Sequence, residues 1–271
     1  RGGTLTIQGR AQTATTETIG NVVVAQGFAV INPLVGGTGV NSVDVFAGDL
    51  SRTAGSGATL IVQGTNTGTI GNNSRMFVTS IGGVSTSTLG AGLTNNIVGG
   101  WAENGNNFLT YTPGMGFAAL GQAGAAAYDL INLVPTGDNS TKNVKLTATT
   151  TIAAGGANVN ALTLNGANIA LNFTNATDVL NLTSGGLIGP NNNQTIGATL
   201  DSGRLTAGGL TPTANSDLYI FNRTNTLTLN SRIIDNPNGG TSSVRLVLTA
   251  SRGAITMLNS NNRYTVCTIL N

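Results

Sequence analysis

The side chains that could do chemistry are few in this chain, and their types exclude most catalytic mechanisms. The 271 residues include ten acidic residues, one cysteine and no histidine. Without imidazole, the chain cannot build a Ser-His or Cys-His nucleophile or a histidine-ligated zinc site. The remaining option is a carboxylate pair that acts as acid and base on a glycosidic bond. Asp44 and Asp49 have the closest spacing, and Asp201 could meet Asp217 on a neighbouring strand.

The acidic residues are scattered, so we predict no enzyme activity, no catalytic residue and no cofactor. Two acidic turns, at 138–140 and 235–238, each offer a single carboxylate. Calcium takes about six to eight oxygen ligands, usually several of them carboxylates. We therefore interpret both segments as plain turns and predict no metal site. A polysaccharide lyase or hydrolase stays a less favoured alternative.

Cys267 is the only cysteine, which excludes a disulfide within one chain. It could join two chains in an oxidising compartment. A lone cysteine is more often a small buried hydrophobe, and we favour that interpretation.

Trp101, Phe108 and Tyr111 are three large aromatic residues close together in the middle of the chain. Aromatic faces can stack on sugar rings, so the three could contact a glycan. The alternative is that they fill a wide part of the protein interior or cap a loop, and we favour this packing role.

The charge pattern excludes two classes of partner. Charged residues make up 8% of the chain and the formal net charge is +2, against about 25% charged residues in ordinary soluble proteins. No basic face for nucleic acid is expected. No run of 18 apolar residues exists, so we expect no transmembrane helix. The chain starts at Arg1 without a signal peptide, and we interpret it as a mature or excised part of something longer.

The elements that must position these residues are short strands. Val, Ile, Leu and Thr alternate in short runs, as in 161–164, 179–182 and 244–248. Alternation of this kind is typical of strands. The chain contains 39 Gly, 41 Thr and 34 Asn, and Gly and Asn between the runs tolerate left-handed turns. We predict an all-β protein without helices.

A sandwich, a closed barrel and a parallel β-solenoid all fit such a pattern. Between Val144 and Leu187 an apolar pair recurs about every 8–10 residues, which favours a solenoid with roughly 20–30 residues per coil. Stacked Asn and Thr side chains would form hydrogen-bonded ladders in place of charge. We predict a parallel β-helix with an irregular central insertion, as one domain over 1–271 or with sub-regions 1–140 and 141–271.

Seven segments in a fixed order cover nearly the whole chain: 17–24, 50–60, 99–111, 143–147, 162–167, 203–209 and 253–265. Together, with the Gly99-Gly100-Trp101-Ala102 block in the middle, they resemble the autotransporter-associated β-strand repeat proteins, which are large bacterial surface proteins. The resemblance implies a secreted parallel β-helix that acts as a stalk, adhesin or surface fibre, and it implies no catalytic residues. A structural fibre subunit is our leading hypothesis, and a glycan-binding adhesin is the alternative.

The sequence departs from the repeat after Tyr264, where a strand-like run replaces the expected Gly-Gly turn. We predict that this apolar C-terminal strand is buried against the N-terminal region of another copy, because open apolar strand edges pair with other chains. The partners would be copies of the chain itself, with surface glycans as a further option. The expected contact residues are Gly3, Leu5, Ile7, Tyr264, Val266, Cys267, Ile269 and Leu270.

Overall fold

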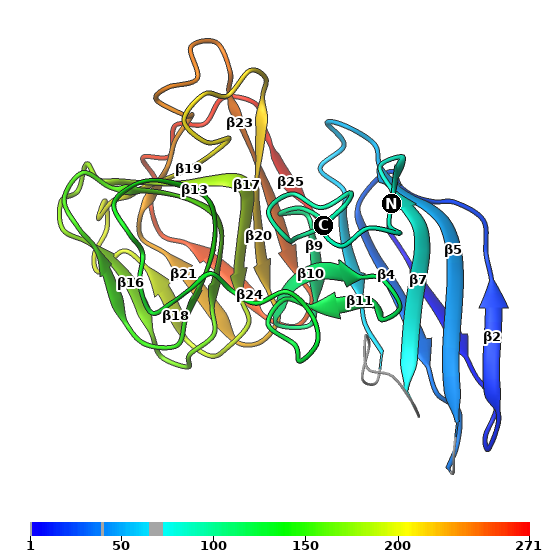
Figure 1. Cartoon of the computed structure of the whole chain (residues 1–271). Helices are drawn as coiled ribbons and strands as arrows, with labels where there is room; N and C mark the ends of the chain where they lie inside the picture. The colour runs from blue at the N-terminus through cyan, green and yellow to red at the C-terminus, as the bar shows by residue number, and fades with distance from the viewer. Residues whose placement is uncertain (1, 39–40, 65–72) are drawn as a thin grey trace. The chain divides into compact units, whose positions relative to one another are not determined.

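The computed structural model describes residues 2–38, 41–64 and 73–271, and these residues form strands and turns without any helix (Figure 1). Their contacts divide the chain into two compact units, residues 1–127 and 128–271. The prediction of an all-β protein is confirmed. Whether the chain acts as one domain stays a prediction.

The first unit contains two sheets, named here after a central strand of each. The β4 sheet is parallel from β1 to β9 and ends in an antiparallel ribbon from β9 to β11. Its strands are β1 (Thr4–Gln8), β4 (Phe28–Leu34), β6 (Thr59–Val62), β9 (Ala102–Asn104), β10 (Asn107–Thr112) and β11 (Gly116–Ala119).

The β5 sheet pairs its long strands in parallel. β5 lies alongside β2 through its first half and alongside β3 through its last residues. Its strands are β2 (Ala14–Thr18), β3 (Val22–Val24), β5 (Ser42–Arg52), β7 (Ser74–Ile81) and β8 (Val84–Ser85). Only β8 is antiparallel to its neighbour among these described strands.

The second unit also contains two sheets, and every named pairing in both is parallel. The β17 sheet holds β12 (Leu130–Ile131), β13 (Gly137–Leu146), β15 (Ala157–Leu164), β17 (Val179–Gly189), β19 (Arg204–Ala207), β20 (Ser216–Asn222), β22 (Arg232–Ile233), β23 (Val244–Ala250) and β25 (Thr268–Leu270). The β21 sheet holds β14 (Thr150–Ile152), β16 (Ala170–Phe173), β18 (Gln194–Ile196), β21 (Thr226–Leu229) and β24 (Ala254–Met257).

Parallel partners are separated by a similar length of chain in both units. Val43 lies opposite Ser74 in the first unit, and Leu227 lies opposite Ile255 in the second. The separation is not constant, because Leu60 on β6 lies opposite the much later Ala102. The spacing of roughly 20–30 residues per coil that the apolar pattern predicts is therefore close for most parallel pairs and too short for some.

Each unit has its own hydrophobic core, built from the inward-facing residues of its strands. Every residue of β15 is buried, which is typical of a parallel strand covered on both faces. Leu162 and Leu164 on this strand, and Leu180 and Leu182 on β17, belong to the core of the second unit. The alternating apolar residues of the sequence thus point inward as predicted.

Asparagine side chains link neighbouring strands and turns. Asn160 Nδ2 donates to Asn143 Oδ1 over 2.7 Å inside the second unit. Similar amide pairs join Asn191 to Asn165 and Asn193 to Asn168. A glycine is required just before β15, since a Cβ on Gly156 would lie 2.4 Å from the carbonyl oxygen of Val179. Ladders of like polar residues therefore occur, although they are local.

Candidate functional site: open strand edges and a surface groove

Two of the carboxylates that could have formed a catalytic pair each bind a cation on an adjacent strand. Asp44 lies opposite Arg75 in the register of β5 and β7, and they form a bidentate ion pair with distances of 2.7 and 2.5 Å. Hydrogen bonding to Asp44 raises the pKa of the Arg75 guanidinium. Asp217 and Arg245 also pair, across β20 and β23, at 2.5 Å. These acids link strands.

Asp201 gathers three segments of the second unit. It accepts hydrogen bonds from Arg232 Nε and from Asn259 Nδ2, each at 2.7 Å, and from Asn261 Nδ2 at 3.1 Å. The Arg232 hydrogen bond, followed by that of Asn259, holds the pKa of Asp201 far below its ordinary value. The carboxylate therefore stays ionised at neutral pH and ties together turns that come from successive passes of the chain.

Asp49, which follows Asp44 on β5, has separate partners. It accepts hydrogen bonds from the Gly83 backbone at 2.8 Å and from the Ser80 hydroxyl at 2.7 Å. The Gly83 and Ser80 hydrogen bonds lower the pKa of its carboxyl group. In the described residues, no group of three or more His, Cys, Asp or Glu is placed to hold a metal ion.

Two of the three aromatic residues singled out in the sequence lie inside the first unit. Phe108 is fully buried, and Tyr111 is buried edge-on against Phe117 with ring centroids 5.2 Å apart. The Tyr111 hydroxyl donates to the Val78 carbonyl at 3.2 Å. Trp101 is half-buried under the Arg52 guanidinium. A sugar-stacking platform needs open ring faces, and in this structure Phe108 and Tyr111 present none.

The first unit also carries a partly exposed aromatic pair that the sequence pattern did not predict. Phe46 and Phe77 lie opposite each other on β5 and β7 and stack with centroids 4.9 Å apart. Phe46 is 40% exposed. The Phe46–Phe77 and Asp44–Arg75 pairs are separated by the same number of residues along the chain. This repeated separation is visible in the sequence, but it indicates strand pairing only once the register of β5 and β7 is known.

The first strands of the first unit leave an open edge. β1 pairs with β4 alone among the described strands. Next to it lies a cavity of about 310 Å³, here called the N-terminal hollow, whose lining combines buried core residues with exposed apolar ones. Leu5 is 46% exposed and Val23 is 59% exposed. The hollow is lined by Gly3, Thr4, Leu5, Val22, Val23, Val24, Ala29, Val30, Ile31 and Leu60.

The last strands of the second unit leave a second open edge. Within the described residues, β24 pairs only with β21, and β25 pairs only with β23. Leu258 is 52% exposed and Leu270 is 76% exposed. No charged residue lies in β24 or β25. Charges and prolines are the usual protection of exposed strand edges, and these two strands contain neither.

The C-terminal run is less regular than predicted. We expected one strand through Tyr264 to Leu270, but the strand covers only Thr268–Leu270, and Arg263 forms an isolated parallel bridge with Ile234. The chain does fold back onto its own sheet after the missing Gly-Gly turn. Cys267 is exposed, so its interpretation as a buried hydrophobe is wrong. It lies before the strand and outside the core.

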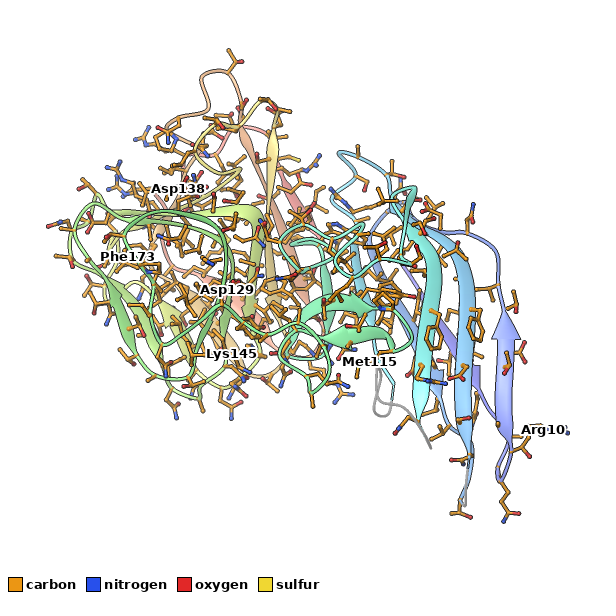
Figure 2. The ribbon with its side chains drawn as sticks, viewed as in Figure 1. Arg10, Met115, Asp129, Asp138, Lys145 and Phe173 are labelled. Carbon is orange, nitrogen blue, oxygen red and sulfur yellow. The ribbon has the colours of Figure 1, made fainter. Side chains whose placement is uncertain are left out.

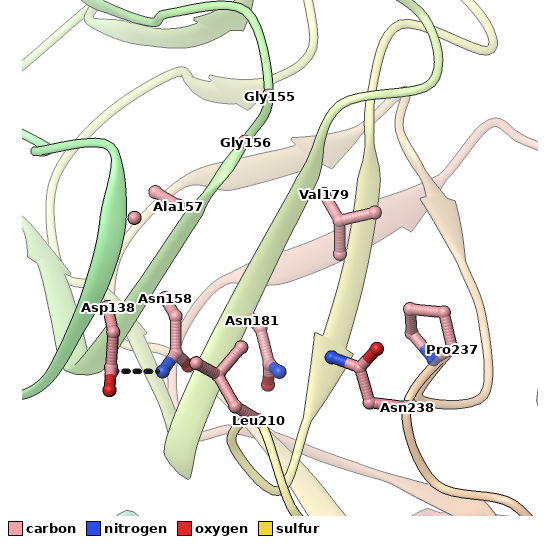
Figure 3. Close-up of a pocket in the computed structure, with 11 residues that line it drawn as sticks. Asp138, Gly155, Gly156, Ala157, Asn158, Val179, Asn181, Leu210, Pro237 and Asn238 are labelled. Carbon is pink, nitrogen blue, oxygen red and sulfur yellow. Dashed lines mark hydrogen bonds between the residues drawn. The ribbon is translucent and has the colours of Figure 1, made fainter.

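A groove with a mixed polar and apolar lining crosses the β17 sheet, and one of its lining residues, Asp138, is labelled in Figure 2. Asp138, Asn158 and Asn181 lie opposite one another on three successive strands, β13, β15 and β17 (Figure 3). Asn158 Nδ2 donates to Asp138 Oδ1 at 2.9 Å. The groove, here called the Asp138 groove, has a volume of about 290 Å³. Its lining continues through Leu210, Pro237 and Asn238.

None of the described residues forms a helix that could cross a lipid bilayer. Comparison of the chain with protein-family models, curated proteins and solved structures finds no match.

Proposed function

We propose that the chain is a structural subunit of an extracellular bacterial surface fibre or array, and that both units are parallel β-helices. Copies would join head to tail through their open strand edges. One observation carries the proposal: the strand order at the end of the second unit is continued by the strand order at the start of the first. The surface location is supported by the resemblance to autotransporter-associated repeats.

Strands alternate between two sheets along most of both units. A single strand of the β4 or β21 sheet is followed by one long or two short strands of the β5 or β17 sheet. The last described strands follow this order, because β24 lies in the β21 sheet and β25 lies in the β17 sheet. The first described strands are β1, then β2 and β3. A second copy that starts with β1 after β25 therefore continues the alternation without a missing strand.

The inward and outward residues of β25 match those of β3. Leu270 lies opposite Leu248, a residue packed on the core, so Leu270 faces inward. On β3, Val24 is buried in the core and Val23 is 59% exposed. Pairing Leu270 with Val24 of the next copy also aligns Ile269 with Val23. A shift by one residue would turn every side chain to the wrong face.

The same match holds between β24 and β1. Ile255 and Met257 pack on the core of the second unit, so Ala254 and Thr256 face outward. On β1, Ile7 packs on the core of the first unit, and Leu5 shares its face because side chains alternate along a strand. β1 of one copy laid on β24 of another would stack Leu5 on Ile255 and Ile7 on Met257.

Burial of these apolar edges would provide the affinity, together with backbone hydrogen bonds, as in other cases of strand addition. Leu270 of one copy would enter the N-terminal hollow of the next copy. The two surfaces differ, so the contact is heterologous. A heterologous contact that does not close into a ring produces an open filament.

A cysteine cross-link tests the contact and its register. The variant Cys267→Ser/Ile269→Cys/Val23→Cys places one thiol on each proposed partner strand. Paired strands bring such residues within reach of a disulfide, which requires Cα atoms about 4.4–6.8 Å apart. Mild oxidation should give a ladder of covalent dimers, trimers and longer oligomers on a non-reducing gel.

The matched control is Cys267→Ser/Ile269→Cys/Val84→Cys. Val84 is also an exposed valine, at 51%, but it lies on β8, outside the proposed contact. It should give no ladder. Equal ladders from the two variants, or no ladder from either at concentrations where filaments are imaged, would contradict the proposed contact.

A further inference from the structure

We propose that the Asp138 groove of the second unit is a binding site for a neutral saccharide segment. The proposal does not depend on fibre assembly, because the groove crosses β13, β15 and β17 and leaves out β24 and β25. In Figure 3 the side chains of Asp138, Asn158, Asn181 and Asn238 follow one another across the site. Of these four, Asp138 and Asn238 are exposed and can meet a ligand, whereas Asn158 and Asn181 are buried and hydrogen-bonded to their own neighbours.

The polar groups suit hydroxyls as ligands. Asp138 is exposed, and hydrogen bonds from Ser140 and then Asn158 lower the pKa of its carboxyl group. At neutral pH it is therefore a hydrogen-bond acceptor with a negative charge, to which sugar hydroxyls can donate. The side chain of Asn238 also lines the groove. Its amide can both donate to a hydroxyl and accept from one.

The remaining lining is apolar and flat. Leu210 is 42% exposed, and Val179, Ala157 and Pro237 line the same space. Gly155 has no side chain, and a Cβ there would have open space around it. Small-molecule sites commonly combine apolar walls with a few placed polar groups. A sugar ring has the same combination, with C–H groups on its faces and hydroxyls on its rim.

Other ligand classes fit less well. No Lys or Arg is among the described residues that line the groove, so the carboxylate of Asp138 would repel an anion. A single carboxylate is a poor site for a divalent cation. The carboxylate of Asp138 and the amide of Asn238 are exposed in the groove, and their desolvation disfavours a purely apolar ligand.

The dimensions limit the ligand to a short segment. The volume of about 290 Å³ lies at the small end of ligand sites. The row from Asp138 to Asn181 spans two strand spacings, or about 10 Å. One or two sugar rings fill such a space.

The experiment uses the full chain and four neutral disaccharides as probes: cellobiose, maltose, lactose and N,N′-diacetylchitobiose. Saturation-transfer NMR observes the ligand protons, so it works with single subunits and with assemblies. Equilibrium dialysis gives the dissociation constant. We expect at least one probe to bind, and the variants Asp138→Ala and Asn238→Ala to weaken that binding about tenfold, since each removes one direct contact.

The control variant is Asp49→Ala, which removes a half-buried carboxylate of the first unit. It should leave the dissociation constant unchanged. The inference is overturned if none of the four probes binds, or if Asp138→Ala and Asn238→Ala bind a probe as tightly as the Asp49→Ala control. Loss of binding in Asp138→Ala with intact filaments would separate this site from the assembly contact.

Discussion

Truncation of Leu270 to alanine should weaken assembly while leaving the folded subunit unchanged. Leu270 is 76% exposed in the single chain, so it contributes little to the stability of its own unit, and the substitution should change unfolding by less than about 0.5 kcal/mol. In the proposed contact, the same side chain enters the N-terminal hollow of the next copy. It is therefore a residue whose burial depends on assembly alone.

The size of the effect follows from this exposure. Complete burial of a leucine side chain is worth about 1.5–3 kcal/mol, or about 0.8 kcal/mol per methylene. Most of Leu270 is still open to burial, and alanine keeps only the β-carbon. Loss of about 1.5–2 kcal/mol per contact is expected, which corresponds to a roughly 10–30-fold higher critical concentration for assembly.

The assay is sedimentation of the assembled fraction across a concentration series, with imaging of the pellet. Leu89→Ala is the control, because Leu89 is 72% exposed but lies outside the proposed contact. It should assemble like the unmodified chain. If Leu270→Ala and Leu89→Ala have the same critical concentration as the unmodified chain, Leu270 is not buried between copies and the proposed contact is wrong.

Three further predictions concern the second unit. The pKa of Asp201 is lower in the folded chain than in the unfolded chain. Its ionised carboxylate therefore stabilises the fold above the unfolded pKa of about 4, and this stabilisation is lost as the pH falls below that value. Thermal unfolding of Asp201→Asn should depend less on pH below about 4 than that of the unmodified chain. Leu162 is fully buried, and Leu162→Ala should lower the free energy of unfolding, measured with denaturant, by about 2–5 kcal/mol. The control Leu200→Ala changes a residue that is 60% exposed, and it should lower that free energy by less than about 0.5 kcal/mol. Asn160→Ala leaves the buried amide of Asn143 without one partner and should cost about 1–3 kcal/mol; the double variant Asn143→Ala/Asn160→Ala should cost less than the sum of the single changes in the same assay.

The chemistry of the candidate sites was only partly predictable. Trp101, Phe108 and Tyr111 are close in sequence, but Phe108 and Tyr111 are buried. Phe46 and Phe77 are distant in sequence and become neighbours only through the register of β5 and β7. Proximity in sequence is a poor guide where most sheet contacts join residues on different passes of the chain.

The sequence by itself determined most of the strands, their inward faces and many of the turns, although residues 138–140 were interpreted as a turn and lie in β13. Leu162 and Leu164 are separated by a threonine, and such alternation assigns faces within a single strand, without knowledge of the partner. Glycine and asparagine mark turns for an equally local reason, because they tolerate positive φ, as Asn168 does at 57°. Composition alone also excluded histidine chemistry.

Only the tertiary structure decided which strands pair and in what register. The offset between parallel partners varies, since Thr4 lies opposite Val30 whereas Leu60 lies opposite Ala102, because the turns differ in length. Each change in the sequence separation of paired strands brings different residues next to one another. The Asp44–Arg75 pair and the Asp138 groove could therefore not be located from the sequence alone. The exposure of Leu270 and Cys267 depends on the same pairing, since a strand is buried only when another strand covers it.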